Sequence, residues 1–236
     1  MSQTITGKAP AADFPVIPSY NTLMYARLHE RQIRTTARIH SGAESVFTSK
    51  QKLITMKCME DTMSLYTFEG RIPEVAESAY IFENATVIGA VTIGENVWVG
   101  PGAVLRGDYG KISVGAYTAV EDNCVIHARP GEQADIGEHV TLGHASIVHT
   151  GRVSDWATLG MGSVVSDFAR VGKWAAVGEG CVVKARSEIP DESVAVGVPA
   201  RVIGKITQEY RDVWTKYKEN YNTFCRRYRD SLGKIA

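Results

Sequence analysis

The residues of this chain with the clearest chemical potential are three histidines in its middle. They are His127, His144 and His149. Three neutral imidazoles and one open position form the ligand set of a catalytic zinc ion, whereas structural zinc prefers four closed ligands, often cysteines. Zinc also lowers the pKa of a bound water to about 7. The trio therefore suggests a catalytic metal site. The competing interpretation is that each histidine occupies an ordinary corner or interface position.

The histidines lie within a hexapeptide repeat. Aliphatic residues recur every six positions, often with a glycine directly after them. The first run is Ile81, Val87, Ile93, Val99 and Leu105. A period of six fits neither an α-helix nor a hairpin array. It predicts an all-β solenoid wound as a triangular prism, whose coils pair as parallel strands. Longer gaps in the repeat predict corner loops over residues 108–112 and 128–135.

The repeat also predicts where two of the histidines lie. Counting aliphatic positions in threes assigns Leu105, Ile126 and Val148 to the same face in successive coils. The polar residues that directly follow them should form one column along an edge of the prism. These residues are Arg106, His127 and His149. Since adjacent coils lie about 4.8 Å apart, His127 and His149 are close enough to share a metal ion.

The third histidine belongs elsewhere on the prism. His144 follows Leu142, which is assigned to a different face, so its side chain should point from another corner. It is poorly placed to join the column of its own chain. If prisms pack side by side as a trimer, His144 reaches the column of a neighbour. The predicted site is therefore divided between two subunits.

Three motifs give the chain a family resemblance. They are Leu105-Arg-Gly-Asp108, Val120-Glu-Asp-Asn-Cys-Val-Ile-His127 and Gly143-His-Ala-Ser-Ile-Val-His149. The sequence over residues 65–206 resembles the γ-class carbonic anhydrases, a hexapeptide-repeat group. The resemblance implies a left-handed parallel β-helix that forms a homotrimer with Zn2+ (Fe2+ or Co2+ in some settings) at each interface. It assigns His127 and His149 to one subunit and His144 to the next.

The same resemblance implies an activity, the reversible hydration of CO2 to bicarbonate. It makes Arg106 and Asp108 an ion pair between subunits beside the metal, and the guanidinium is suited to binding bicarbonate. The alternative interpretation is that this pair is a solvated surface ion pair, which contributes under about 1 kcal/mol to stability. Glu121 occupies the position where the family usually has a glutamine, and a carboxylate there is expected to act as a base.

Other positions differ from the most active carbonic anhydrases. Tyr109 occupies a position where those enzymes carry a glutamate. The loop after His127 is short and does not contain the long acidic insertion of those enzymes. Because proton export commonly limits carbonic anhydrase turnover, the expected lyase activity is weak. A second resemblance fits these details better. The segments 106–112 and 121–127, the Arg-Pro-Gly turn and the tyrosine-rich tail resemble the phenylacetate-degradation and carnitine-operon branch, which is linked to coenzyme A metabolism.

Three further functions compete with the lyase hypothesis. A metal-dependent acyl-CoA thioesterase would use the same site. A hexapeptide acyltransferase would share the turn Gly197-Val-Pro-Ala-Arg201, but such enzymes use a lone histidine as base and need no metal. A non-catalytic trimeric scaffold would keep the metal for structure alone. The small-molecule partner is thus CO2 and bicarbonate or a CoA thioester.

The composition and the pattern of the sequence limit the partners, the location and the domain organisation that we expect. The 236 residues carry no formal net charge and are 44% apolar, which gives no sign of nucleic acid or membrane partners. Four scattered cysteines favour reduced thiols and a cytoplasmic location. We expect a β-helix over residues 63–205 and an amphipathic helix over residues 206–236, capped by Thr207. Residues 1–62 lack the repeat. They are expected to be a disordered extension, a transit segment or an over-extended start.

Overall fold

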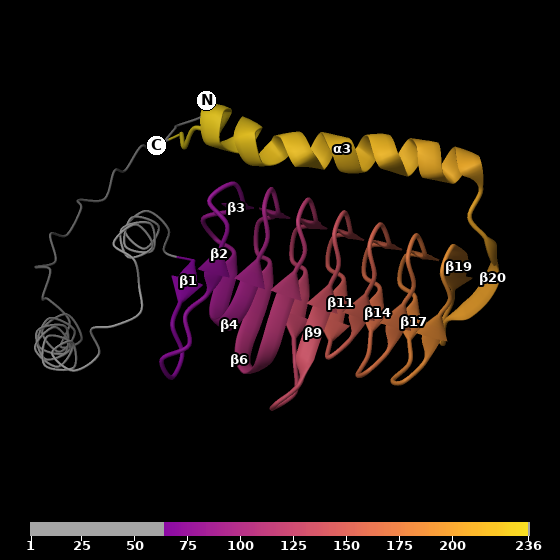
Figure 1. Cartoon of the computed structure of the whole chain (residues 1–236). Coiled ribbons are helices and arrows are strands. Elements are labelled where there is room, and N and C mark those ends of the chain that lie inside the picture. The colour runs from indigo at the N-terminus through magenta and orange to yellow at the C-terminus, as the bar shows by residue number, and fades with distance from the viewer. Residues whose placement is uncertain (1–63, 236) are drawn as a thin grey trace, which may run out of the picture. The chain divides into compact units, whose positions relative to one another are not determined.

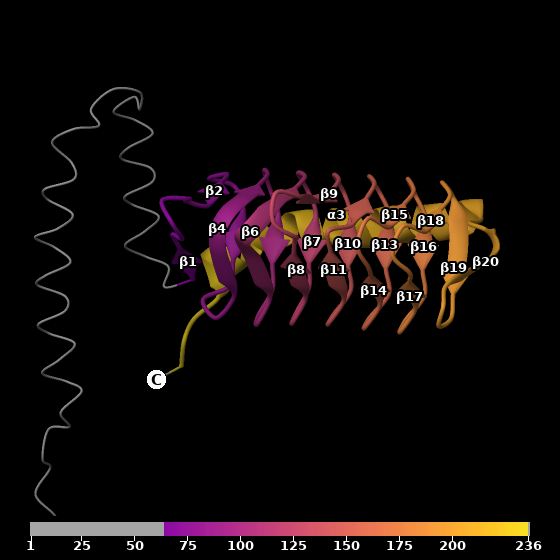
Figure 2. The same ribbon diagram turned by 90° about the horizontal axis from the view of Figure 1, so that it is seen from below.

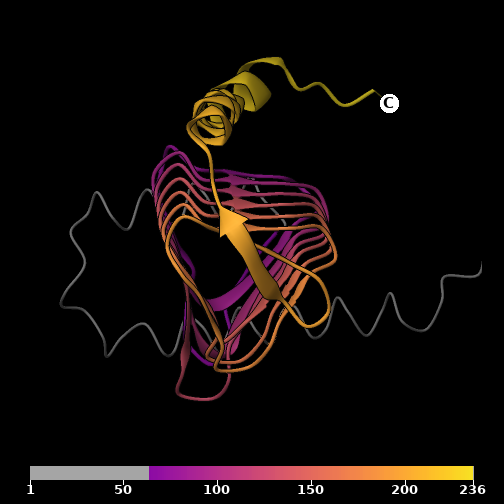
Figure 3. The same ribbon diagram turned by 90° about the vertical axis from the view of Figure 1, so that its right-hand side faces the viewer.

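The computed structural model describes residues 64–235. The expected extension over residues 1–62 lies outside these described residues. From Leu65 to Lys205 the chain is wound as a left-handed parallel β-helix of about seven turns. Figure 1 shows the coils stacked in a row, Figure 2 shows the same row from below, and Figure 3 shows their triangular cross-section. The predicted fold class is confirmed.

The prism has three faces, which we name after strands in its middle. The β8 face contains β1 (Leu65–Tyr66), the first half of β4 (Thr86–Ile93), the first half of β6 (Val104–Val114), β8 (Val125–His127), β11 (Ile147–His149), β14 (Val164–Val165) and β17 (Val182–Val183). The β9 face contains β2 (Glu74–Val75), the second halves of β4 and β6, β9 (Gln133–Ile136), β12 (Arg152–Val153), β15 (Arg170–Val171) and β18 (Glu188–Ile189). The β10 face contains β3 (Tyr80–Ile81), β5 (Trp98–Val99), β7 (Ala119–Val120), β10 (Thr141–Leu142), β13 (Thr158–Leu159), β16 (Ala176–Val177), β19 (Ser193–Val196) and β20 (Arg201–Lys205).

The inward side chains of the three faces form the core. On the β8 face the inward row is continuous and fully buried over Val87, Leu105, Ile126, Val148, Val165 and Val183. Fully burying one such aliphatic side chain stabilises the fold by about 1.5–3 kcal/mol. The row fixes which residue of each hexapeptide points inward, and thereby fixes which residue reaches each corner.

One of the two predicted corner loops, the loop over residues 108–112, is wrong. Residues 108–112 do not leave the prism but belong to the long strand β6, which passes from the β8 face to the β9 face without interruption. Ile112 pairs with Val91 of β4 and with Ala134 of β9. The extra residues are absorbed where the register of β4 and β6 shifts, between Gly89 and Val91. The pairing of Lys111 and Ile112 with β9 keeps the end of the segment in the sheet.

Helix α3 (Gln208–Ser231) follows the prism. The Thr207 side chain caps it, as predicted, by accepting a hydrogen bond from the Tyr210 backbone N–H at 3.1 Å. The helix runs back along the β10 face toward the first coils (Figure 1). Its aromatic residues pack on Trp98, whose ring centroid lies 5.6 Å from that of Tyr221 and 5.6 Å from that of Tyr228.

The buried stripe of α3 differs from the predicted one. The spacing of apolar residues predicts a buried stripe from Tyr210 to Tyr228. Val213 and Tyr217 of this stripe are exposed, whereas its other members are partly buried, namely Tyr210, Trp214, Tyr221, Phe224 and Tyr228. The fully buried positions are Lys218 and Cys225. The helix is therefore rotated relative to the expectation, and it places a lysine against the prism.

Cys124, Cys181 and Cys225 are buried free thiols. Within residues 64–235, no helix combines the length and the apolar character needed to cross a bilayer.

Candidate functional site

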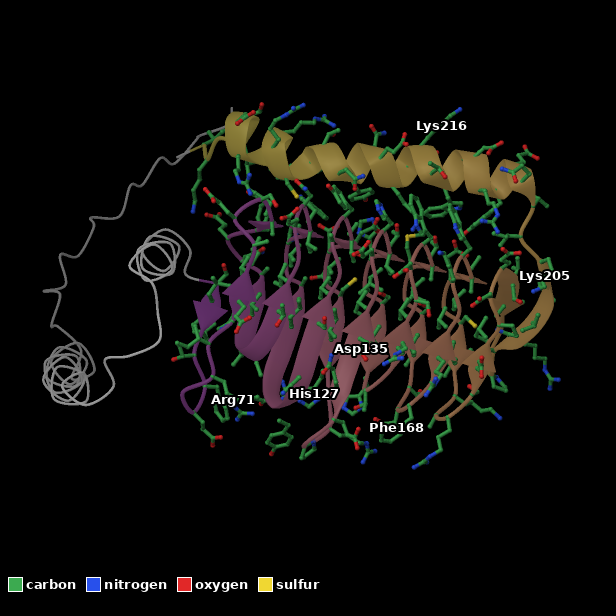
Figure 4. The ribbon with its side chains drawn as sticks, viewed as in Figure 1. Arg71, His127, Asp135, Phe168, Lys205 and Lys216 are labelled. Carbon is green, nitrogen blue, oxygen red and sulfur yellow. The ribbon has the colours of Figure 1, made fainter. Side chains whose placement is uncertain are left out.

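Two of the three histidines meet at the corner between the β8 and β9 faces. His127 ends β8 and His149 ends β11, and the two residues are direct partners in the parallel ladder. The Nδ1 atom of His127 lies 3.1 Å from the Nε2 atom of His149. Thr150 turns the chain here with a left-handed φ of 51°, and its N–H donates to the His127 carbonyl at 2.9 Å. This corner lies away from α3, where Figure 4 labels His127.

A carboxylate contacts the far side of each imidazole. Asp108 Oδ1 lies 3.0 Å from His127 Nε2, and Asp167 Oδ1 lies 2.6 Å from His149 Nδ1. Each carboxylate also accepts from an arginine, at 2.7 Å in one case and 2.6 Å in the other. The result is a continuous sequence of contacts that we call the histidine row: Arg106, Asp108, His127, His149, Asp167 and Arg129.

Both carboxylates of the histidine row are held ionised. Burial alone would raise the pKa of Asp108, but hydrogen bonds from Arg106 and His127 outweigh it and lower the pKa below its ordinary value. The hydrogen bond from Arg129, helped by the one from His149 and opposed by burial, holds the pKa of Asp167 well below its usual range. Each carboxylate therefore accepts an N–H from its imidazole near neutral pH.

This arrangement constrains the two facing nitrogens. If His127 donates from Nε2 and His149 donates from Nδ1, the remaining nitrogen of each neutral ring carries a lone pair. Two lone pairs 3.1 Å apart repel unless a cation, either a shared proton or a metal ion, lies between them. Metal-binding histidines usually donate their second N–H to a carboxylate or carbonyl. Two nitrogens bound tetrahedrally to zinc at about 2.0–2.1 Å are roughly 3.3 Å apart. The donor set of His127 and His149 thus fits two positions of a metal site.

The third histidine lies at the corner between the β10 and β8 faces. Ala145 turns the chain there with a left-handed φ of 59°. His144 Nδ1 lies 2.6 Å from Asp122 Oδ2, and its Nε2 lies 3.2 Å from Glu121 Oε2. Glu121 also accepts the backbone N–H of His144 at 3.1 Å. As the register predicts, His144 does not meet the other two histidines within one chain. Among residues 64–235, no group of three or more His, Cys, Asp or Glu side chains is arranged to hold a metal.

The predicted site residues therefore fall into two groups. Arg106, Asp108, His127 and His149 come together at one corner, and Glu121 accompanies His144 at the other. Glu121 is buried, with 7% of its surface exposed, because the turn of His144 folds over it. Within one chain Glu121 lies beside His144 and apart from the His127–His149 pair, and its expected role as a base stays a prediction.

Sequence reasoning missed Asp167 and Arg129. The repeat held a signal for the first, because Val165 continues the inward row of Ile126 and Val148 by one coil. Extending the count places Ser166 in the column of the histidine pair, and Asp167 is the next residue along the chain. Arg129 lies in the loop after β8, where the hexapeptide register is interrupted, so spacing alone could not locate its side chain.

The β8 face separates the two corners and presents an apolar strip to the outside. Its outward positions are Val104, Val125, Ile147, Val164 and Val182. Val125 and Ile147 are the most exposed, at 37% and 38% of their surface. A flat row of aliphatic side chains on the outside of a sheet is typical of an interaction surface.

Comparisons with known proteins agree with this fold and these motifs. The chain is 35% identical over 162 residues to the carnitine operon protein CaiE of Escherichia coli (strain K12), covering 64% of this chain and 83% of that protein. It is also 35% identical over 167 residues to the same protein of Salmonella agona, covering 70% and 84% of the two chains. The chain belongs to this hexapeptide-repeat family. No protein-family model matches it.

Solved structures also resemble this hexapeptide-repeat protein. A hexapeptide transferase family protein from Anaplasma phagocytophilum is 34% identical, with a TM-score of 0.67 over 70% of this chain and 98% of that one. A putative acetyltransferase from Bacillus cereus is 31% identical, with a TM-score of 0.70 over 72% of this chain and 98% of that one. The resemblance to the carnitine-operon branch, predicted from the motifs, is confirmed.

Proposed function

We propose that the chain is a homotrimeric enzyme that cleaves an acyl-CoA thioester with water, at a site shared between subunits. The observation that carries the proposal is the facing pair of imidazoles, His127 and His149, each held by a carboxylate. One chain supplies only these two ligands at that corner. The partner subunit's His144 supplies the third.

The outside of the β8 face supports the trimer. It carries the apolar strip, one corner that offers two imidazoles and another corner that offers one. In a ring with three-fold symmetry every subunit uses both corners, so each interface receives one complete set of three histidines. Burying Val125 and Ile147 between subunits supplies part of the association free energy.

The metal fits the residues present. His127 and His149 of one subunit and the partner's His144 would hold zinc, or iron or cobalt, which also accept imidazole ligands. When bound, such an ion supplies Lewis acidity and lowers the pKa of a water to about 7. Asp108 and Asp167 fix the ring orientations and increase the basicity of the two imidazoles that they contact.

The remaining residues have roles that follow from their contacts. Arg106 is 43% exposed and uses one N–H group on Asp108, so its other N–H groups can donate to the thioester carbonyl oxygen. The partner's Glu121 arrives with His144 and accepts a proton from the attacking water. A C–O bond forms as the C–S bond breaks, and the thiol leaves with a proton. The products are a carboxylic acid and coenzyme A.

Several features favour a thioester over CO2. One solved structure, at 31% identity, is described as a putative acetyltransferase, and this description supports an acyl group as part of the substrate. The loop over residues 128–132 carries Glu132 as its sole acid. Tyr109 lies beside His127, with ring centroids 6.0 Å apart, where a shuttling acid would be needed. Fast hydration of CO2 requires such a shuttle.

CO2 hydration is the second candidate. The specific observation in its favour is the Arg106–Asp108 ion pair at 2.7 Å, directly beside the histidine pair. A half-exposed guanidinium oriented by a carboxylate suits the binding of bicarbonate.

The test combines metal analysis with a thiol-release assay on a panel of CoA esters. We expect about one metal ion per chain, thiol release that depends on it, and a loss of at least about 100-fold in His149→Ala. His139→Gln is the matched control, because His139 lies at the third corner, stacked between Tyr117 and Trp156.

Other outcomes would select a different function. Catalysed hydration of CO2 without cleavage of any CoA thioester would support the lyase. Acyl transfer to an added acceptor that survives His127→Ala would support a metal-independent hexapeptide acyltransferase. A metal-loaded trimer that is silent in every assay would support the scaffold.

A further inference from the structure

Tyr109 is an exposed aromatic residue at the corner of the histidine row. It directly follows Asp108 in β6, and 60% of its surface is exposed. Its ring centroid lies 6.0 Å from that of His127, with the two ring planes tilted by 46°. The Asp108 carboxylate contacts Arg106 at 2.7 Å and His127 at 3.0 Å. An exposed apolar ring therefore lies beside the polar groups to which the proposed function assigns the chemistry.

The backbone next to Tyr109 is tightly packed. A Cβ atom added at Gly110 would lie 2.5 Å from the Glu132 carbonyl oxygen. The Lys111 N–H donates to the same carbonyl at 2.8 Å. The loop after β8 thus packs directly against the residues that follow Tyr109, and this contact limits the movement of the ring. A well-placed aromatic side chain with only two χ angles loses little conformational entropy when a ligand packs on it.

The exposed ring matches one part of the proposed substrate. In the proposed function Arg106 donates to the thioester carbonyl oxygen, and the carbonyl carbon carries two groups, the acyl chain and the sulfur of coenzyme A. The arm that leads from this sulfur contains two amides, which need hydrogen-bond partners. An acyl chain is apolar and gains free energy when it packs on an aromatic face. The surface of Tyr109 therefore suits the acyl chain better than the coenzyme A arm.

We propose that Tyr109 is a specificity-determining residue that binds the acyl chain and favours long chains over acetyl. The inference rests on the proposed function and names the substrate class of that site, CoA thioesters of apolar acids. Burying one methylene group completely strengthens binding about fourfold. Because the Tyr109 ring covers only one side of the chain, we expect about twofold for each methylene.

The experiment measures binding of S-(2-oxoalkyl) coenzyme A thioethers to the metal-loaded full chain by calorimetry. These compounds keep a carbonyl group but cannot be hydrolysed. The 2-oxoheptyl compound has four more methylenes than the 2-oxopropyl compound, so the unmodified protein should bind it about 15-fold more tightly. In Tyr109→Ala this ratio should fall below about threefold, and Tyr109→Phe, which keeps the ring, should retain it.

The matched control is Tyr217→Ala. Tyr217 lies on α3 and is exposed to a similar extent, at 55% of its surface. Its substitution should leave the ratio of the two affinities unchanged. The ratio of kcat/KM for hexanoyl-CoA to that for acetyl-CoA, measured by thiol release, should follow the same pattern. A general loss of structure would weaken both ligands alike, so the ratios report the contact with the acyl chain.

Three results would overturn the inference: a ratio near 15 in Tyr109→Ala, an equal fall in Tyr217→Ala, or thioethers that the unmodified protein binds without preference or not at all. Thiol release would still decide the proposed function in each case. If the thioethers show the expected ratios while no CoA ester is cleaved, the proposed function fails and the acyl-binding role of Tyr109 stands. Should Tyr109→Ala fail to fold, Tyr109→Gln, which also removes the ring, decides the question.

Discussion

Asp167 offers the sharpest test of the histidine row. It accepts one short hydrogen bond from His149 and one from Arg129, both at 2.6 Å. In Asp167→Asn the amide oxygen can accept only one of these donors, and the amide NH2 then faces the other. The variant keeps the size of the side chain but removes its charge. We therefore expect His149 to lose its fixed orientation.

The size of the effect follows from the contact that is lost. Residues that orient a metal-bound histidine typically contribute 10- to 100-fold to metal affinity. This range corresponds to about 1.4–2.7 kcal/mol. Because the contact at 2.6 Å is a short, charge-assisted hydrogen bond, we expect a weakening near the upper end of this range. Competition with a chromogenic chelator measures it.

The control is Asp135→Asn. Asp135 also pairs with an arginine, Arg152, at 2.9 Å on the same chain, but it contacts no histidine. It should bind metal as the unmodified protein does. An affinity in Asp167→Asn within twofold of the unmodified protein, with the trimer intact, would refute the role assigned to the histidine row.

Three further predictions test other parts of the structure. Ile147→Lys should dissociate the proposed trimer in sedimentation experiments because it charges the apolar strip, whereas Val213→Lys on the exposed side of α3 should not. A trimer that persists in Ile147→Lys would show that the strip is not part of the interface. Gly107→Ala should lower the free energy of unfolding by about 1–3 kcal/mol, because its Cβ would lie 2.6 Å from a backbone carbonyl oxygen of the neighbouring coil. Gly204→Ala meets nothing within 4 Å and should be neutral in the same urea titration. Lys218 has a folded-state pKa of about 7 against 10.5 when unfolded, so the unfolded chain binds more protons between these values and stability rises with pH. The rise from pH 7 to 9, up to about 2 kcal/mol, should be absent from Lys218→Met.

The sequence predicted the fold well because its period of six is tied to the prism itself. Each inward aliphatic residue occupies one position of a short strand, so Leu105 and Ile126 could be placed on one face by counting. Counting failed between residues 108 and 112, where strand pairing continues through a change of register. A longer gap can be filled by a loop or absorbed by a register shift, and spacing does not distinguish the two.

The site was predictable to the same extent. His127 and His149 follow inward residues directly, so the count placed them together and placed His144 apart. The supporting acid Asp167 comes from the next coil, one residue beyond Ser166, which is the position that a longer count reaches. Lys218 is different, because its burial depends on the rotation of α3 about its own axis. Aromatic side chains on several sides of the helix left that rotation undetermined.

The path of α3 has a consequence for how the solenoid comes apart. In a stack of repeats each coil touches only its neighbours, so such arrays tend to fray from their ends. Here α3 leaves the last coil and returns to the first ones, where Arg229 donates to the Glu77 carbonyl at 2.9 Å and to the Ala79 carbonyl at 2.7 Å. The helix thus connects the last coil to the first coils of the solenoid. Peeling the final coil away would also break contacts at the opposite end, which should make the stack open as one cooperative unit.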